Sequence, residues 1–150
     1  MQAVLFDASI YIAISREKRD TALMLRKMAA GDAVWLSSVV LEELYAGATP
    51  QNRQIAEHLE RDFKRVRRTL VPDLSDWIQT GRVLARLAAK YDYEQIGKGR
   101  LTNDALIALS AGRLGITVVT ANAKDFAKLA EFRPFRWRVS DPRAEEQLRI

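Results

Sequence analysis

The feature that most constrains the fold is a regular alternation of short apolar runs with longer amphipathic segments. The run AVLF at residues 3–6 is apolar throughout, as in a strand covered on both faces of a parallel sheet. Residues 34–36 have the same character, and residues 116–120 form the most β-branched run of the chain. Strands that alternate with helices predict an α/β fold in three layers, with helices flanking a mainly parallel central sheet of four to five strands.

Capping residues and glycines set the boundaries of the expected elements. Ser37 or Ser38 is expected to cap the helix after the second strand, and Thr102 the helix before the most β-branched strand. Residues 92–101 contain two glycines and no clear period, which indicates a loop, and the tail from residue 140 is polar. We therefore expect helices over residues 8–14, 20–30, 38–47, 50–68, 75–91, 102–114 and 123–131, and further strands at 70–71 and, at an edge, 135–139.

Length and composition exclude several classes of protein. The chain has 150 residues without an internal repeat or linker, so a single domain over residues 1–150 is expected. The absence of Cys and the single His, His58, exclude disulfides, thiolate sites and multi-histidine metal sites. There is no apolar run of about 18 residues and no basic start of a signal peptide, so a cytoplasmic protein is expected.

The net charge indicates the kind of partner. A formal charge of +5 and a pI of about 9.7 favour a polyanionic partner such as nucleic acid. The alternative is a soluble protein that is merely rich in arginine, and charge alone does not separate the two. The positions of the acidic residues bear on that choice.

Acidic residues lie where ligands bind in such folds, just beyond the carboxyl ends of the strands. Asp7 directly follows the first strand, and Asn122 and Asp125 follow the most β-branched one. Glu43 and Asp104 lie in the neighbouring helices. Taken singly, each acid has an ordinary explanation, such as an N-cap for Asp7 or a helix-dipole contact worth about 0.3–1 kcal/mol for Asp104 and Asp125.

Helical geometry separates the adjacent Glu42 and Glu43 in the segment VVLEELYAGA, residues 39–48. The apolar residues of this helix lie almost opposite Glu42, which is therefore expected in solvent. Glu43 points to the side, one turn before the small residues Ala46 and Gly47. A carboxylate beside small residues predicts a gap that can hold a cation, water and a phosphate.

Asp104 repeats this arrangement in an almost wholly apolar helix, with Ala108 and Ala111 at one and two turns, so burial beside a gap is expected. Converging carboxylates repel one another unless a positive charge lies between them. Because only oxygen ligands are available, the expected ion is Mg²⁺ or Mn²⁺, which can activate water for attack on a phosphodiester. An acidic centre in a basic protein thus predicts a metal-dependent nuclease.

Four segments together resemble the PIN domain, and more narrowly the VapC-type toxins of bacterial and archaeal toxin–antitoxin pairs. The resemblance covers about residues 2–139 and implies a Mg²⁺- or Mn²⁺-dependent ribonuclease with a parallel sheet flanked by helices. It also implies an RNA substrate, a homodimer and inhibition by a cognate small antitoxin protein. The segments are FDAS (6–9), LEELYAG (41–47), NDALIAL (103–109) and TANAKDF (120–126).

The resemblance implies roles for individual residues. The family often has an acid where Asn122 stands, so whether Asn122 or Asp125 contacts a metal stays open. Tyr11 and Ile12, beside the first strand, are expected at dimer or antitoxin contacts. The positions expected to be catalytic and metal-binding are Asp7, Glu43, Asp104 and Asp125, and the supporting polar positions are Ser9, Thr120 and Asn122.

Two alternative functions would also suit parts of this sequence. A non-catalytic RNA- or protein-binding module on the same fold would have an incomplete acidic pocket, whereas all four acidic positions are filled here. A phosphatase of the haloacid dehalogenase type also begins with an apolar strand that ends in Asp. That chemistry needs a second Asp two residues later, where this chain has Ser9.

Overall fold

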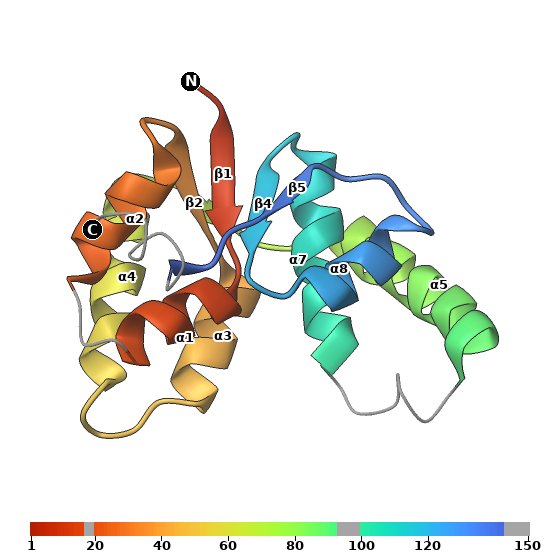
Figure 1. Ribbon diagram of the computed structural model, residues 1–150, viewed down its shortest axis with the longest axis horizontal. Coiled ribbons are helices and arrows are strands. Elements are labelled where there is room, and N and C mark those ends of the chain that lie inside the picture. The colour runs from red at the N-terminus through yellow and green to blue at the C-terminus, as the bar shows by residue number, and fades with distance from the viewer. Residues whose placement is uncertain (17–19, 93–99, 143–150) are drawn as a thin grey trace.

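The computed structural model describes residues 1–16, 20–92 and 100–142 and contains one five-stranded sheet (Figure 1). The strand order is β3-β2-β1-β4-β5, and every neighbouring pair is parallel. The expected α/β fold is confirmed, and the predicted edge strand near residue 137 forms one edge. The strands are β1 (Ala3–Phe6), β2 (Ala33–Ser37), β3 (Thr69–Leu70), β4 (Thr117–Thr120) and β5 (Trp137–Val139).

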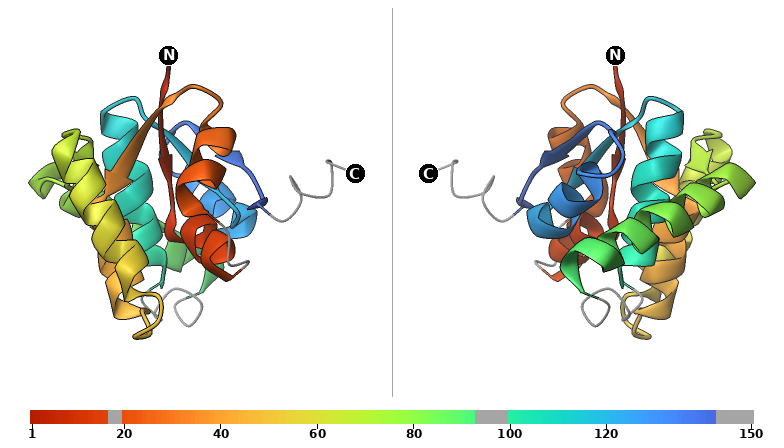
Figure 2. Two further views of the ribbon diagram at one scale, coloured as in Figure 1. Left: turned by 90° about the vertical axis from the view of Figure 1, so that its left-hand side faces the viewer. Right: turned by 90° about the vertical axis from the view of Figure 1, so that its right-hand side faces the viewer.

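Helices cover both faces of the sheet. The two side views show the two helix layers in turn (Figure 2). None of the described helices combines the length and apolar character that a membrane span requires. On one face lie α1 (Ala8–Arg16), α2 (Thr21–Ala29), α3 (Ser38–Ala46) and α4 (Arg53–Arg65), and on the other α5 (Leu74–Tyr91), α7 (Arg100–Arg113) and α8 (Ala123–Ala130).

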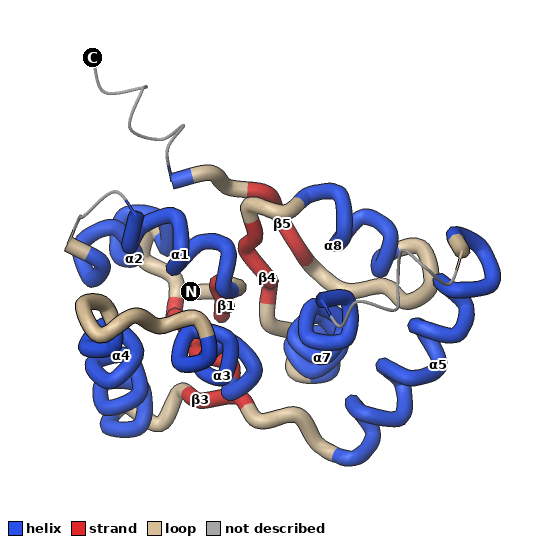
Figure 3. The backbone as a smooth tube through the Cα atoms, turned by 90° about the horizontal axis from the view of Figure 1, so that it is seen from below, coloured by secondary structure: helices blue, strands red, loops and turns tan. Residues whose placement is uncertain are grey.

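The strand order reverses between β1 and β4. From β1 the chain moves outward through β2 to β3, and then crosses back to β4 on the other side of β1. Crossovers of the same hand that run in opposite directions place their helices on opposite faces, which leaves a crevice at the carboxyl ends of β1 and β4. Figure 3 looks onto this end of the sheet, where Asp7 follows β1 and Thr120 ends β4.

Local signals explain several element boundaries. Ser37 caps α3, because its Oγ accepts a hydrogen bond of 3.1 Å from the amide of Val39. Gly115, with φ of +69°, forms the turn between α7 and β4. The predicted cap at Thr102 is wrong, because α7 begins at Arg100 and Thr102 lies inside its first turn.

Two predicted ranges are only partly matched. The helix expected over residues 50–68 spans only Arg53–Arg65, and the chain leaves the helical path at Arg67, which has φ of +57°. The loop expected at residues 92–101 lies mostly outside the described residues, as does most of the polar tail.

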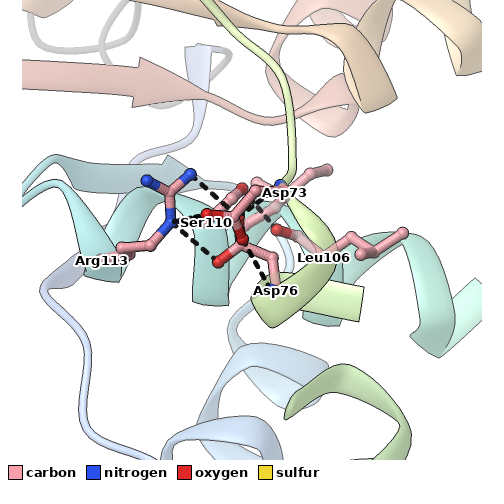
Figure 4. Close-up of polar contacts among 6 residues, drawn as sticks. Asp73, Asp76, Leu106, Ser110 and Arg113 are labelled. Atoms are coloured by element: carbon pink, nitrogen blue, oxygen red, sulfur yellow. Dashed lines mark hydrogen bonds and ion pairs between the residues drawn. The ribbon is translucent and has the colours of Figure 1, made fainter. Parts of the chain in front are cut away.

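An ion pair joins α5 to α7 (Figure 4). Asp76, in the first turn of α5, has a side chain only 4% exposed and forms a capping box with Asp73. Arg113, the last residue of α7, donates through Nε and Nη2 to the Asp76 carboxylate at 3.0–3.2 Å. The hydroxyl of the buried Ser110 donates to the Leu106 carbonyl one turn earlier in α7. The pair fixes α7 against α5.

Candidate active site

Asp7 and Thr120 meet where the strand order reverses. The pairing of Phe6 with Val119 places the next two residues opposite each other, and the Asp7 amide continues the ladder to the Val119 carbonyl at 3.1 Å. Thr120 Oγ1 donates to Asp7 Oδ2 at 2.6 Å, and Ser9 Oγ donates to Asp7 Oδ1. Both Asp7 and Thr120 are buried. The sheet register and two hydroxyls therefore fix the Asp7 carboxylate in one orientation.

The same network reaches the start of α8. The Asn122 amide donates to Thr120 Oγ1 at 2.9 Å, and the side-chain amide of Asn122 donates to Asp125 Oδ2 at 2.8 Å. Asn122 Oδ1 also caps α8 by accepting from the Asp125 amide. The Ala121 amide donates to Ser9 Oγ at 3.0 Å. Asp125 is thus connected to Asp7 through Asn122 and Thr120.

Glu43 brings a second carboxylate from α3 towards Asp7. Its Oε1 is buried and has no hydrogen-bond partner in the described part of the chain. Burial, together with the negative charges of Asp7 and Glu42, raises the pKa of Glu43 to about 7. Glu42 is exposed, as expected, and accepts a hydrogen bond of 3.3 Å from Asn103 Nδ2. The two adjacent glutamates therefore occupy opposite environments.

Burial also raises the pKa of Asp7, although the hydroxyls of Ser9 and Thr120 and the amides of Ile10 and Ser9 oppose that rise. Over residues 1–16, 20–92 and 100–142, no ion pair includes Asp7 or Glu43. The buried Asp7 and the half-buried Glu43 are therefore neighbouring carboxylates with no cationic side chain paired to either of them in that part of the chain. Mg²⁺ is commonly bound through one or two carboxylates and several waters, so this pair fits a divalent ion.

Asp104 does not form a close carboxylate cluster with Asp7 and Glu43, which the sequence predicted. It lies half-buried in α7, and the bond between its neighbour Asn103 and Glu42 joins the start of α7 to α3. Within the described residues, no three His, Cys, Asp or Glu side chains are grouped closely enough to hold a metal ion. The gap predicted beside Asp104 is wrong, because Ala108 and Ala111 are fully buried and pack in the core.

Tyr11 occupies a place that the sequence did not indicate. It is only 1% exposed, packs edge-on against Phe6 with ring centroids 6.4 Å apart, and so offers no ring to a partner. Its hydroxyl is buried without a hydrogen-bond partner in the described part of the chain, and burial together with the charge of Asp7 raises its pKa. Ile12, by contrast, is 40% exposed. The one available signal was spacing, since Tyr11 lies one helical turn after Asp7.

Comparisons with known proteins agree with this architecture. The family model of the PIN domain matches residues 4–132. A chain of the DNA-bound VapBC complex from Salmonella typhimurium is 24% identical, with a TM-score of 0.66 over 93% of this chain and 98% of that chain. A chain of VapBC2 from Rickettsia felis, bound to a promoter DNA fragment, is 21% identical, with a TM-score of 0.67 over 93% and 100%.

A third structure, of VapBC-5 from Mycobacterium tuberculosis, belongs to the VapBC family of toxin–antitoxin systems. Its matching chain is 25% identical, with a TM-score of 0.50 over 93% of this chain and 98% of that chain. No curated protein matches the sequence significantly.

Proposed function

This chain belongs to the PIN-domain family, and from that premise we propose that it is a Mg²⁺- or Mn²⁺-dependent endoribonuclease. We further propose that it acts in the cytoplasm as the toxin of a toxin–antitoxin pair. The observation that carries the proposal is Oε1 of the half-buried Glu43, which is buried and unpartnered within the described residues and lies near the buried carboxylate of Asp7. Two hydroxyls hold Asp7, but Glu43 Oε1 has no partner within the described residues to offset the cost of its burial, which favours a cation-binding role over a purely structural one.

In this proposal, the residues of the crevice have two roles: some bind the metal ion and others position its ligands. Asp7 and Glu43 would hold the ion, and Ser9 and Thr120 keep Asp7 in place through their hydroxyls. Such an ion, when bound, activates a water and neutralises charge that develops on the phosphodiester. We assign Asp125 to the same site as a further carboxylate, held by the Asn122 amide.

Asp104 is the fourth acidic residue that we place in the catalytic group. Its half-buried position in α7 and the contact of Asn103 with α3 put the start of this helix beside the Glu42–Glu43 pair. Because Mg²⁺ keeps several waters, a carboxylate outside the immediate pair can act through one of them. We therefore propose that all four acidic residues take part in catalysis, and that Asp7 and Glu43 bind the metal ion directly.

The toxin role rests on the likeness to VapBC complexes and on a groove suited to a partner segment. A depression of about 710 Å³ lies between α2 and α4, with an apolar floor that includes Leu25, Leu59 and Phe63. Asp20, Asp62 and other polar residues line its rim. We propose that a segment of a small antitoxin, apolar on one side, occupies this groove. Copurification with the product of a neighbouring small gene tests it.

A homodimer is supported by the outer face of α5, which forms the edge of the molecule in Figure 3. Leu74, Trp77 and Ile78 are 76%, 55% and 46% exposed, and the residues that follow on the same face, Gly81 and Ala85, are small and exposed. A Cβ added at Gly81 would meet no atom within 4 Å. Two antiparallel copies of α5 would therefore set large side chains over small ones, and we propose this face as the dimer contact.

The activity is tested with purified protein, structured RNA and either Mg²⁺ or EDTA. Cleavage is expected only with the metal, and Asp7→Asn is expected to abolish it. Equal cleavage by the wild type and this variant would reject the assignment, since a contaminating nuclease would explain the result. RNA binding that survives EDTA, with no cleavage of any RNA, would instead favour a non-catalytic binding module.

A further inference from the structure

The densest basic run of the chain lies at the end of α4, outside the crevice. Residues 61–68, RDFKRVRR, contain five basic side chains and one acid. Two of the five lie in the last turn of α4 and pair with acids of the same helix. The other three, Arg61, Arg67 and Arg68, form no ion pair within the described residues and are called the arginine patch below. The whole run covers about two helical turns, so these cations lie within about 10 Å of one another along the chain.

The turn that carries two of these arginines has a backbone conformation that favours glycine. The Arg68 amide donates to the Phe63 carbonyl at 3.1 Å. The Arg67 amide donates to the Lys64 carbonyl at 3.2 Å, and the two bonds together form a Schellman motif. The residue after the helix cap is left-handed in this motif and is usually glycine, whereas here it is Arg67, with φ of +57°. An arginine at this strained position indicates a use for its side chain outside the turn.

The arginine patch lies at the edge of the sheet that β3 forms. Arg68 directly precedes β3, and its carbonyl accepts a hydrogen bond of 2.9 Å from the Leu36 amide of β2. Neighbouring strands are about 4.8 Å apart, so β3 lies about 10 Å from β1, which Asp7 follows. In the view onto the carboxyl ends of the strands, β3 lies at the rim of the molecule and α3 lies between it and β1 (Figure 3). A polyanion with one phosphate in the crevice therefore reaches the patch if it continues past α3.

The chemistry of the patch suits a phosphate backbone. A guanidinium binds phosphate through paired donors, and backbone phosphates are contacted by cations without a shaped pocket. The crevice itself presents the carboxylates of Asp7 and Glu43 to an RNA strand, and like charges repel. Much of the favourable charge for RNA binding therefore has to come from cations outside the crevice.

We propose that the arginine patch is a second RNA-binding site, which holds the phosphate backbone of the substrate a few nucleotides away from the bond that is cleaved. The inference rests on the proposed ribonuclease function, because that function places an RNA strand in the crevice. The patch supplies affinity without reading the sequence, and hydrolysis is left to the acidic residues. It favours an RNA that is long or folded enough to contact both sites at once.

The test measures binding and cleavage of one fluorescein-labelled RNA hairpin. In EDTA and at low salt, fluorescence anisotropy should show that Arg67→Gln binds the hairpin about 3- to 10-fold more weakly than the wild type. The slope of log Kd against log salt concentration should become shallower by about 0.7–0.9, the share of one phosphate contact. Arg61→Gln should behave in the same way. With Mg²⁺, both variants should raise KM and keep the wild-type kcat, because neither side chain contacts the reacting atoms.

Three control variants separate phosphate binding from general effects. Arg133→Gln removes an exposed guanidinium between α8 and β5, at the other edge of the sheet, and should leave affinity and salt slope unchanged. Arg67→Gly removes the charge and also relieves the backbone, so it should raise the melting temperature while it weakens RNA binding. Ala30→Gly, at the left-handed end of α2, should raise the melting temperature and leave RNA binding unchanged.

Wild-type affinity and salt slope in both Arg67→Gln and Arg61→Gln would overturn the inference, whatever the rate of cleavage. Polyglutamate that displaces the hairpin as well as polyuridylate does would also overturn it, in favour of an acidic protein segment on the patch. Failure of the proposed function has a different signature. The patch variants would then bind the hairpin more weakly, as expected, but the wild type would show no metal-dependent cleavage.

Discussion

The hydroxyl of Thr120 donates a hydrogen bond of 2.6 Å to Oδ2 of Asp7, although 113 residues separate the two in the chain. The bond crosses the point where the strand order reverses, so it exists only when β1 and β4 pair in the correct register. It stabilises the ionised carboxylate, because a donor to the charged form opposes the effect of burial. Sheet register and the readiness of Asp7 to bind a cation are therefore coupled.

The first prediction concerns Thr120→Val, which keeps the shape of the side chain and removes the donor. Asp7 should ionise less readily and turn more freely, so cleavage should fall by about 10- to 100-fold, as for other partners of metal ligands. The measurement is the initial rate at several Mg²⁺ concentrations, and the loss should shrink as Mg²⁺ rises. Thr117→Val, on the same strand, is the control and should keep the wild-type rate.

The second prediction contrasts two neighbours on α3. Glu43→Gln should lower cleavage by more than about 100-fold, beyond the usual cost of losing a residue that only supports a ligand. Glu42→Gln should be nearly silent, because Glu42 is exposed, and its stability should change by no more than about 0.5 kcal/mol. Equal losses in both variants would mean that charge near the crevice matters and position does not.

The sequence predicts this contrast because a helix has a fixed period, which separates residues 42 and 43 by about 100° whatever surrounds them. The same reasoning fails at Ala108 and Ala111, where small residues predict open space and the structure has none. Small side chains also allow two elements to approach closely, and here they are fully buried in the core. Periodicity gives direction, but only the tertiary structure shows what lies in that direction.

The polar network of the crevice was predictable in part. The residues that follow β1 and β4 were expected at one edge of the sheet, and Asp7 does bond to Thr120. The buried and unpartnered Tyr11 hydroxyl could not be foreseen, because whether a helix face meets solvent or a neighbouring helix depends on long-range packing. The ion pair between Arg113 and Asp76 could not be foreseen either, because it joins residues 37 positions apart and depends on how α5 packs against α7.

The third prediction concerns stability and pH in EDTA. The pKa of Glu43 lies at about 7 in the folded chain and at an ordinary 4.5 when unfolded. Between these values the folded chain keeps a proton that the unfolded chain has released, so stability should fall as the pH rises through this window. The raised pKa of Asp7 acts in the same direction.

Melting temperatures at pH 5 and pH 8 measure this effect. The wild type and Glu42→Gln should melt lower at pH 8, whereas Glu43→Gln should show a smaller difference. Added Mg²⁺ should raise the wild-type melting temperature at pH 8 more than at pH 5, because only the ionised pair attracts the metal. An unchanged pH difference in Glu43→Gln would show that burial of this carboxylate does not control stability.

The fourth prediction concerns the pair between α5 and α7. Burial raises the pKa of Asp76, but hydrogen bonds from Arg113 and from the Asp73 amide outweigh it and bring this pKa below its usual value. Arg113→Met should leave a buried carboxylate without its cation and cost about 3 kcal/mol, the lower end for a broken buried pair. Urea unfolding at pH 7 measures it.

Arg133→Met is the control for this pair, because among the described residues the Arg133 guanidinium makes one exposed hydrogen bond, to Gln79 Oε1 at 3.2 Å. It should cost no more than about 0.5 kcal/mol. The wild-type advantage over Arg113→Met should also disappear as the pH falls through the lowered pKa of Asp76, since a protonated carboxyl no longer needs the cation. An advantage that persists in acid would assign the effect to packing of the arginine stem.

The last prediction concerns the outer face of α5. Leu74 is 76% exposed in the single chain, so Leu74→Glu should fold normally while placing a charge in the proposed dimer contact. Light scattering after size exclusion should give a dimer for the wild type and a monomer for this variant. Leu23→Glu, at a 47% exposed leucine of α2, should remain dimeric. Gly81→Leu should also dissociate the dimer, because antiparallel pairing leaves no room for a second large residue there, and a dimer that tolerates it would exclude this face as the contact.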